Sequence, residues 1–264
     1  MRRLITTVVL ILLFSAAAHP QEIQTGFLDR SITVNGSEYR YVVYVPREFN
    51  KSKTWPVIIA LHGGGEYGND GLKQTAGGLA KEIRLNPARF PAIVVFPQAH
   101  ADNTPGWQLE GGKAALAELD LAIKEFNGDP KRVYITGLSA GGNGSWFLLS
   151  RYPERFAAAV VVCGYVSAFT GRTSGVSYPS LAPESKTDPF SAIAQRVRSI
   201  PIWIFHGDAD QNVSVEESRK MFAALKALGS DVRYTELPGV AHNAWEQAYS
   251  RADVFEWLFK QTRK

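Results

Sequence analysis

The chain has 264 residues, of which 45% are hydrophobic and 20% charged, and its formal net charge is +4 at pH 7. This length suits one ordinary domain with a sizeable core, and the composition excludes a disordered chain. The only cysteine, Cys163, cannot form an internal disulfide, so we expect core packing to hold the fold together. Cys163 ends the apolar run AAAVVVC, which predicts a small buried side chain.

Residues 1–18 have the three parts of an export signal. MRR is a positive start, LITTVVLILLF is an apolar stretch, and SAAAH has Ala16 and Ala18 in an A-x-A pattern. The apolar stretch is shorter than the roughly 20 residues of a membrane-spanning helix. We expect cleavage near Ala18, a mature domain of residues 19–264, and a secreted or periplasmic protein without stable membrane insertion.

The net charge gives no reason to expect a nucleic-acid partner. Loss of Arg2 and Arg3 with the signal segment lowers the formal charge from +4 to +2. No run of lysine and arginine with interleaved aromatic residues indicates such a partner either.

A β-hairpin is the first element expected after the signal segment, because SITVNGSEYRYVVYVP alternates on both sides of Asn35-Gly36. The pattern then changes to short, nearly continuous apolar runs. These runs are PVIIALHGGG, AIVVFPQA, RVYITG, FAAAVVVCG, IPIWIFHG and VRYTELPG. Each is typical of a strand buried on both faces, as in a parallel sheet.

Helical patterns alternate with these runs. They are LKQTAGGLAKEIR, ALAELDLAIKEFN, GNGSWFLLSRY, VEESRKMFAALKALG and NAWEQAYSRADVFEWLFKQ. A hairpin followed by repeated strand–helix units predicts an α/β fold with a doubly wound, mostly parallel sheet. The one long irregular stretch, from Val166 to Phe190, is polar, so we expect no large lid domain.

Three candidate catalytic residues follow three different apolar runs. Ser139 lies in GLSAG, a G-x-S-x-G pattern, Asp210 lies in HGDADQNV, and His242 lies in PGVAHNAW. Sites in such sheets lie at the carboxyl ends of the strands, and the order Ser, Asp, His is that of the α/β-hydrolase fold. His242 would take the serine proton, and Asp210 would fix the imidazole tautomer. Asp208 remains an alternative to Asp210.

Hydrolysis of a carbonyl also needs donors for the oxyanion. The N–H of Ala140 would supply one, and Gly64 in LHGGGEYG is the choice for the second, with Gly63 and Gly65 as alternatives. The same stretch also spells G-x-G-x-x-G. A dinucleotide site would need a helix opening within this motif and an acidic residue after the next strand, and both are missing, so we expect no cofactor.

The other histidines and two tryptophans have simpler interpretations. His62, His100 and His206 show no tight spacing of a zinc site, so we expect no metal and take His206 only as the end of a strand. Trp146 is expected in the core. Trp107, in NTPGWQLEGG, is the candidate for a wall of the substrate cleft, with burial in the core as the alternative.

Five segments carry a family resemblance: LHGGGEYGND, DPKRVYITGLSAGGNGSW, YPERFAAAVVVCG, PIWIFHGDADQNV and YTELPGVAHNAW. From about Tyr41 to its C-terminus the chain resembles the small secreted α/β-hydrolases described as phospholipase/carboxylesterase-like or "predicted peptidase" proteins. These are relatives of the feruloyl and acetylxylan esterases and the polyhydroxybutyrate depolymerases. The resemblance implies Ser139, Asp210 and His242 as the triad.

The expected activity is that of a secreted serine carboxylesterase. It would hydrolyse short-chain or aromatic esters of the acetyl or feruloyl type, free or linked to polysaccharide, through an acyl-enzyme. A peptidase or an acyltransferase on the same triad is the alternative. A polyester depolymerase is less favoured, because the disulfide pairs of many such enzymes are missing, and a non-catalytic binding module is disfavoured by the intact triad residues.

Overall fold

The computed structural model describes residues 24–100, 106–170, 177–183 and 188–263. The expected signal segment lies outside these ranges. No helix within them is both long enough and apolar enough to span a bilayer.

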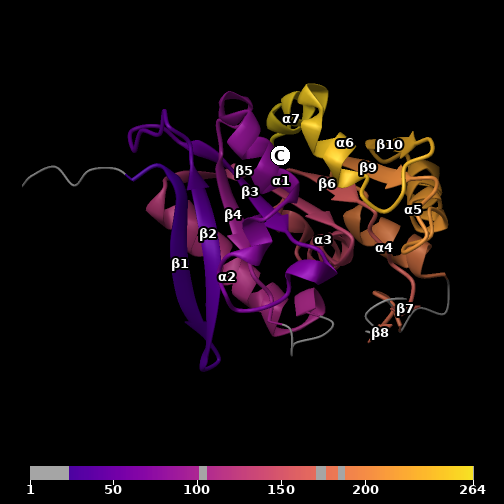
Figure 1. Cartoon of the computed structure of the whole chain (residues 1–264). Helices are drawn as coiled ribbons and strands as arrows, with labels where there is room; N and C mark the ends of the chain where they lie inside the picture. Colours follow the sequence, from indigo (N-terminus) through magenta and orange to yellow (C-terminus); the bar gives the residue numbers. More distant parts are fainter. Residues whose placement is uncertain (1–23, 101–105, 171–176, 184–187, 264) are drawn as a thin grey trace, which may run out of the picture.

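An eight-stranded sheet forms the centre of the described part of the chain, in the order β1-β2-β4-β3-β5-β6-β9-β10 (Figure 1). β2 is antiparallel to both of its neighbours, and the pairings from β4 to β10 are all parallel. The predicted hairpin and mostly parallel sheet are therefore confirmed. The strands are β1 (Gly26–Val34), β2 (Ser37–Val45), β3 (Trp55–Leu61), β4 (Ile93–Pro97), β5 (Gly128–Leu138), β6 (Ala158–Val162), β9 (Ile202–Gly207) and β10 (Val232–Leu237).

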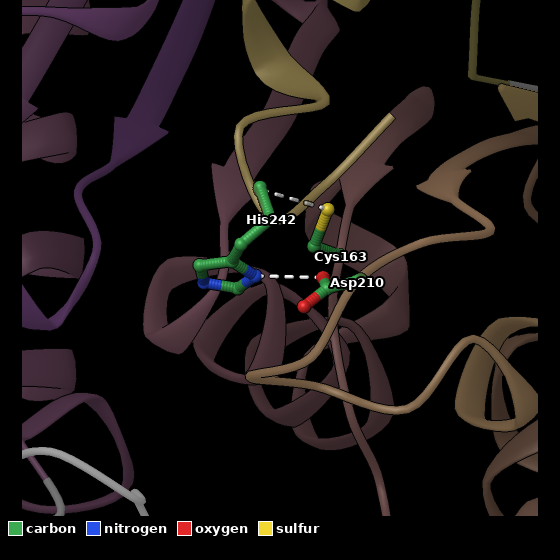
Figure 2. A group of neighbouring side chains, drawn as sticks. All are labelled: Cys163, Asp210 and His242. Carbon is green, nitrogen blue, oxygen red and sulfur yellow. Dashed lines mark hydrogen bonds and ion pairs between the residues drawn. The ribbon is translucent and has the colours of Figure 1, made fainter. Parts of the chain in front are cut away.

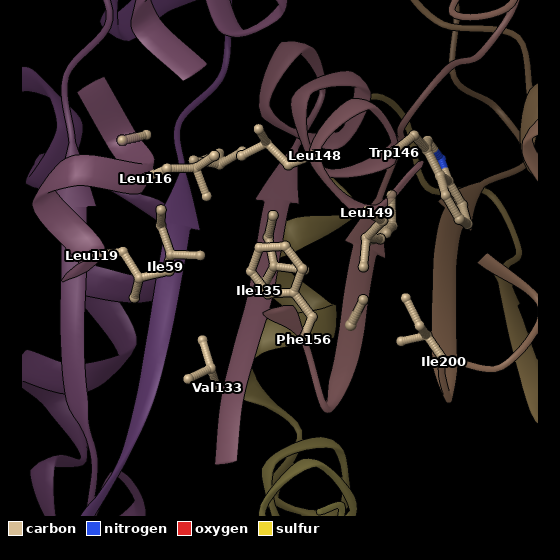
Figure 3. Packing of buried hydrophobic residues seen from close by; sticks show 14 of the residues in the cluster. Ile59, Leu116, Leu119, Val133, Ile135, Trp146, Leu148, Leu149, Phe156 and Ile200 are labelled. Atoms are coloured by element: carbon tan, nitrogen blue, oxygen red, sulfur yellow. The ribbon is translucent and has the colours of Figure 1, made fainter. Parts of the chain in front are cut away.

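Helices cover both faces of this sheet, as a doubly wound fold requires (Figure 1). They are α1 (Gly78–Leu85), α2 (Glu110–Glu125), α3 (Ala140–Arg151), α4 (Pro189–Val197), α5 (Glu216–Ala227), α6 (Trp245–Ser250) and α7 (Ala252–Phe259). Side chains of α2 to α5 share one buried cluster, and side chains of α1, α6 and α7 share the other. Neighbouring strand residues point to opposite faces. Ile59 and Ile135 therefore lie in the first cluster (Figure 3), whereas Ile58 and Tyr134 lie in the second.

Two stretches differ from their sequence patterns. The last helical pattern is broken at Arg251, whose backbone is extended, so that α6 and α7 are separate helices. With this break both helices bury aromatic side chains in one cluster, among them Tyr249 and Phe255. The polar stretch from Val166 to Phe190 contains, in its described part, a short hairpin of β7 (Phe169–Thr170) and β8 (Ser177–Tyr178).

One carboxyl group on α2 is buried without a hydrogen-bond partner among the described residues. Glu118, in α2, is 0% exposed, and neither of its carboxyl oxygens has a hydrogen-bond partner in the described structure. Burial raises the pKa of Glu118 well above its ordinary value, because the ionised form would lose its hydration.

This pKa shift predicts a pH-dependent stability. The pKa of Glu118 in the folded protein is raised above the unfolded value of about 4.3. The contribution of the protonated Glu118 to the free energy of unfolding is therefore fully present below about pH 4, and it is lost as pH rises through the folded pKa. In Glu118→Gln, the free energy of unfolding should therefore fall less between about pH 5 and pH 8 than in the parent, measured by urea unfolding. Glu256→Gln, an exposed change on α7, should keep the parental pH dependence. Equal pH slopes for the parent and Glu118→Gln would contradict the prediction.

Candidate active site

Ser139 occupies a strained turn between β5 and α3. Its φ is 53° and its ψ is −116°, in a region that costs a non-glycine residue free energy. Its N–H donates to the carbonyl of Val162 at 2.9 Å, and its own carbonyl accepts the N–H of Asn143 at 3.0 Å. The neighbouring strand and the first turn of α3 thus hold the serine in this conformation.

The flanking glycines are required by close backbone packing. A Cβ on Gly137 would lie 2.1 Å from the carbonyl oxygen of Gly141, and a Cβ on Gly141 would lie 2.1 Å from the carbonyl oxygen of Leu61. Such contacts are far shorter than van der Waals distances, so a side chain at either position would push α3 away from the sheet. The G-x-S-x-G pattern therefore brings the start of α3 against the end of β3.

The side chains of Ser139, His242 and Asp210 form one hydrogen-bonded chain. The Nε2 atom of His242 lies 2.9 Å from the Oγ atom of Ser139, and its Nδ1 atom lies 2.7 Å from Oδ2 of Asp210. Ser139 follows β5, Asp210 follows β9, and His242 lies between β10 and α6, so three strand ends contribute. Figure 2 shows the imidazole turned toward the carboxylate. The geometry is that of a base joined to a hydroxyl and oriented by an acid.

Asp210 is held as an anion in a dry site. Its side chain is 0% exposed, and Oδ1 accepts the N–H groups of Asn212 at 2.8 Å and Val213 at 3.0 Å. Burial alone would raise the pKa of Asp210, but hydrogen bonds from His206, His242 and Val213 outweigh burial and hold the pKa well below its ordinary value. Asp208, the alternative acid, is exposed and accepts the N–H of Gly239 at 2.6 Å.

Cys163 lies beside this pair, and the three residues together are a geometric candidate for metal binding. One ligand atom from each of Cys163, Asp210 and His242 lies within 4.8 Å of the others (Figure 2). However, burial raises the pKa of the Cys163 thiol, which faces the carbonyl of His242 at 3.5 Å. A metal would need the thiolate, and it would have to break the direct Nδ1–Oδ2 hydrogen bond. The chemistry therefore disfavours a metal, whose absence stays a prediction.

The loop after β3 packs against the Ser139 turn. A Cβ on Gly63 would lie 2.8 Å from Cδ1 of Leu138, the residue before the serine, and Gly64 begins a short 3-10 turn, Gly64–Glu66. Ala140, the other expected oxyanion donor, is the first residue of α3. The loop is therefore close enough to the turn for Gly64, Gly63 or Gly65 to contribute a donor, and this role stays a prediction.

His62 has a role at this loop that the sequence analysis missed. Its Nε2 accepts the N–H of Ala99 at 3.1 Å, so its Nδ1 carries the proton and donates to the carbonyl of Gly63 at 2.7 Å. Burial lowers the pKa of His62 to about 4, which keeps the ring neutral. Because the Gly63 carbonyl and the Gly64 N–H share one rigid peptide plane, His62 fixes the direction of that N–H.

The expectation that Trp107 walls the substrate cleft is wrong. Its side chain is 1% exposed, its Nε1 donates to the carbonyl of His62 at 3.2 Å, and a Cβ on Gly144 would lie 2.6 Å from it. The absence of a side chain at Gly144 lets the indole pack under the loop, with its polar atom satisfied. Trp146 is buried in the core, as predicted.

A small cavity does lie next to the turn. Its volume is about 70 Å³, and Leu138, His62, Glu66, Trp245 and Tyr249 are among its lining residues. The ring of Trp245 meets the His242 imidazole edge to face, with 5.4 Å between their centroids. The cavity is smaller than the roughly 150 Å³ that admits benzene, so its enclosed part suits a small group. The sequence feature that could have indicated Trp245 as a site residue is its position three residues after His242.

The family can now be assigned. Residues 113–264, more than half of the chain, match the prolyl oligopeptidase family. The chain belongs to this family. Together with the sheet order, this match and the likeness to solved esterases establish the α/β-hydrolase fold that the sequence predicted.

Several individual proteins are similar to this member of the prolyl oligopeptidase family. Acetylxylan esterase A of Emericella nidulans is 23% identical over 206 residues, which cover 67% of this chain and 62% of that protein. An uncharacterized secreted protein of Arthroderma benhamiae is 26% identical over 230 residues, covering 80% of this chain and 23% of that protein. The crystal structure of a thermostable esterase has a TM-score of 0.72 and 30% identity, covering 90% of this chain and 63% of that chain. This chain thus spans less than two thirds of each.

Proposed function

We propose that the chain is an exported serine carboxylesterase that cleaves short-chain or aromatic esters through Ser139, His242 and Asp210. The observation that carries this proposal is the hydrogen-bonded chain from Ser139 Oγ through His242 to a fully buried carboxylate. Likeness to an acetylxylan esterase and to a thermostable esterase supports the ester substrate. The N-terminal sequence pattern and the likeness to a secreted protein support export.

The reaction follows from the positions of these atoms. Ser139 Oγ attacks the ester carbonyl while its proton passes to Nε2 of His242, and Asp210 stabilises the imidazolium. The tetrahedral oxyanion would accept hydrogen bonds from the N–H groups of Ala140 and Gly64. As the intermediate collapses, Nε2 returns the proton to the leaving alkoxide, and an acyl-enzyme remains. Water, activated by His242 in the same way, then releases the acid and restores Ser139.

Two features near the nucleophile support a small or aromatic acyl ester. The cavity beside Leu138 holds about 70 Å³, so the enclosed space next to the nucleophile would take a small group. On α3, Ala140 packs in a cluster with Tyr165 and Tyr178, and the partly buried Tyr67 and Phe169 pack against it. Of these rings, the partly exposed Tyr67 and Phe169 would suit contact with a hydroxycinnamoyl group.

A peptidase on the same three residues is the second candidate. The match to the prolyl oligopeptidase family favours it, since that family is named for peptide cleavage. The nucleophile and the base are common to both reactions, and only the leaving group differs: an amine instead of an alkoxide. Substrate comparison therefore decides between them.

A substrate series tests the proposal. With p-nitrophenyl esters from acetate to palmitate, methyl ferulate and aminoacyl p-nitroanilides, we expect kcat/KM to be highest for acetate to butyrate or for methyl ferulate. It should fall steadily as the acyl chain grows, because the cavity cannot enclose more carbons. Ser139→Ala is the control for background hydrolysis. A rise in kcat/KM up to palmitate would contradict the proposed pocket, and anilides that exceed every ester would support the peptidase instead.

A further inference from the structure

A second histidine lies against the carboxylate of Asp210. His206, the penultimate residue of β9, is 0% exposed, and its Nε2 atom is 3.2 Å from Oδ2 of Asp210. The same oxygen accepts the hydrogen bond from His242. We infer that His206 is a positioning residue, which donates a second hydrogen bond to Oδ2 and thereby fixes the carboxylate that orients His242. This inference rests on the proposed function.

The partners of His206 determine where its proton lies. Nε2 also lies 3.1 Å from the carbonyl oxygen of Val213, so it faces two oxygens that can only accept. Nε2 therefore carries a hydrogen. Nδ1 lies 2.7 Å from Oγ of Ser218, a hydroxyl that can donate to an unprotonated ring nitrogen. A neutral ring with its proton on Nε2 thus satisfies every partner, with the hydroxyl of Ser218 on α5 as the donor to Nδ1.

This arrangement completes the hydrogen bonding of Asp210. Oδ1 accepts two backbone N–H groups, from Asn212 and Val213. Oδ2 accepts the ring N–H of His242 and lies 3.2 Å from Nε2 of His206, whose N–H is shared between this oxygen and the carbonyl of Val213. A carboxylate bound on both oxygens cannot rotate without breaking several hydrogen bonds in a site that excludes water. The direction of the bond to His242 is therefore fixed before substrate arrives, as a catalytic site requires.

The other described ionisable side chains around His206 and Asp210 either bind other residues or carry no charge. Glu236 on β10 is the strand partner of His206, but its carboxylate binds Arg219 at 2.6 Å and 2.9 Å and accepts the hydroxyl of Tyr234. The Cys163 thiol lies near Asp210, and burial raises its pKa, so it adds no charge. His242 binds Oδ2 of Asp210 at 2.7 Å, and Nε2 of His206 lies 3.2 Å from the same oxygen.

Two substitutions separate positioning from packing. His206→Leu keeps an apolar side chain in the core and removes the donor, whereas His206→Gln is long enough to place an amide N–H near the Nε2 position. With a p-nitrophenyl ester, and with rates normalised to the active serine by fluorophosphonate titration, His206→Leu should lower kcat about 10- to 100-fold. This is the effect of one hydrogen bond to a charged group. KM should stay within about twofold, because His206 is buried away from the substrate.

The pH profile separates the two roles, because loss of packing alone would leave the profile unchanged. Without His206, Oδ2 has one donor fewer and binds the His242 proton more strongly, so the acidic limb of kcat/KM should move to higher pH in His206→Leu. His206→Gln should restore most of kcat and the parental limb. Parental kcat and limb in His206→Leu would overturn the inference, as would equal losses in both variants with an unmoved limb.

The tautomer of His206 can be measured without a substitution at His206 itself. The ¹⁵N chemical shifts of labelled histidine should show His206 protonated on Nε2 and unprotonated on Nδ1, with Ser218→Ala altering the Nδ1 signal. Protonation on Nδ1 alone would overturn the inference. Failure of the proposed function is a separate result: the parent would hydrolyse none of the esters, while the tautomer of His206 could still be read.

Discussion

Replacing Ser139 with alanine is expected to lower kcat for ester hydrolysis by on the order of 10⁶ while the fold stays intact. The change removes the one hydroxyl that lies 2.9 Å from Nε2 of His242, and nothing else in the chain of hydrogen bonds replaces it. Alanine keeps the Cβ atom, so the strained backbone at φ 53° is as acceptable as in the parent. Steady-state hydrolysis of p-nitrophenyl acetate measures the loss, and circular dichroism measures the fold.

Ser150→Ala is the matched control for this variant. Ser150 lies near the end of the same helix, α3, and its hydroxyl donates to the carbonyl of Phe147 at 2.9 Å. We expect parental kcat in this control. If Ser139→Ala retained more than about a hundredth of the parental kcat, Ser139 would not be the nucleophile, because residual catalysis without it is far smaller.

Replacing Asp210 with asparagine is expected to lower kcat by on the order of 10⁴, as for the acid of a serine-protease triad. Oδ2 of the carboxylate accepts the His242 N–H, and Oδ1 accepts the N–H groups of Asn212 and Val213. In asparagine the two backbone donors should keep the amide oxygen on the Oδ1 side, so the NH₂ group would face His242. His242 would then adopt the wrong tautomer and lose its function as a base for Ser139. The pKa of Asp210 is held well below its ordinary value, so this acid stays ionised and should not itself limit activity near neutral pH.

Asp208→Asn provides the control for the neighbouring acid. Asp208 accepts the N–H of Gly239 in an exposed turn, and asparagine can accept the same hydrogen bond through its amide oxygen. A loss of less than about tenfold is expected, consistent with a neutral hydrogen bond at the surface. A larger loss in Asp208→Asn than in Asp210→Asn, compared by kcat with the same ester, would assign the acid to Asp208.

The sequence was enough to predict the sheet and the edge where the candidate site lies. Apolar runs of strand length show which segments are buried on both faces. Residues that follow the carboxyl ends of parallel strands lie together at one edge of the sheet. The strained turn at Ser139 also follows locally, because GLSAG places glycines where backbone atoms approach within van der Waals contact.

Contacts that depend on how the chain folds in three dimensions could not be predicted in this way. Trp107 is buried because Gly144 and the carbonyl of His62 approach it from other elements, and loop composition alone does not show this. In the sequence, His206 is only a residue near the end of a strand. In the structure, the turn after β9 places the Asp210 carboxylate against its ring. Glu118 fits the polar face of a helical pattern, yet the packing of α2 leaves it without water. In each case three-dimensional packing outweighs local propensity.

Covalent labelling with a fluorophosphonate probe tests the central claim most directly, because the probe reacts fastest with a serine that is activated by a base. Mass spectrometry of the labelled and digested parent should show one adduct, on the peptide that contains Ser139, and Ser139→Ala should show none. Asp210→Asn should react much more slowly, since His242 would be a poor base. An adduct on another residue, or labelling that persists in Ser139→Ala, would contradict the assignment of Ser139 as the nucleophile.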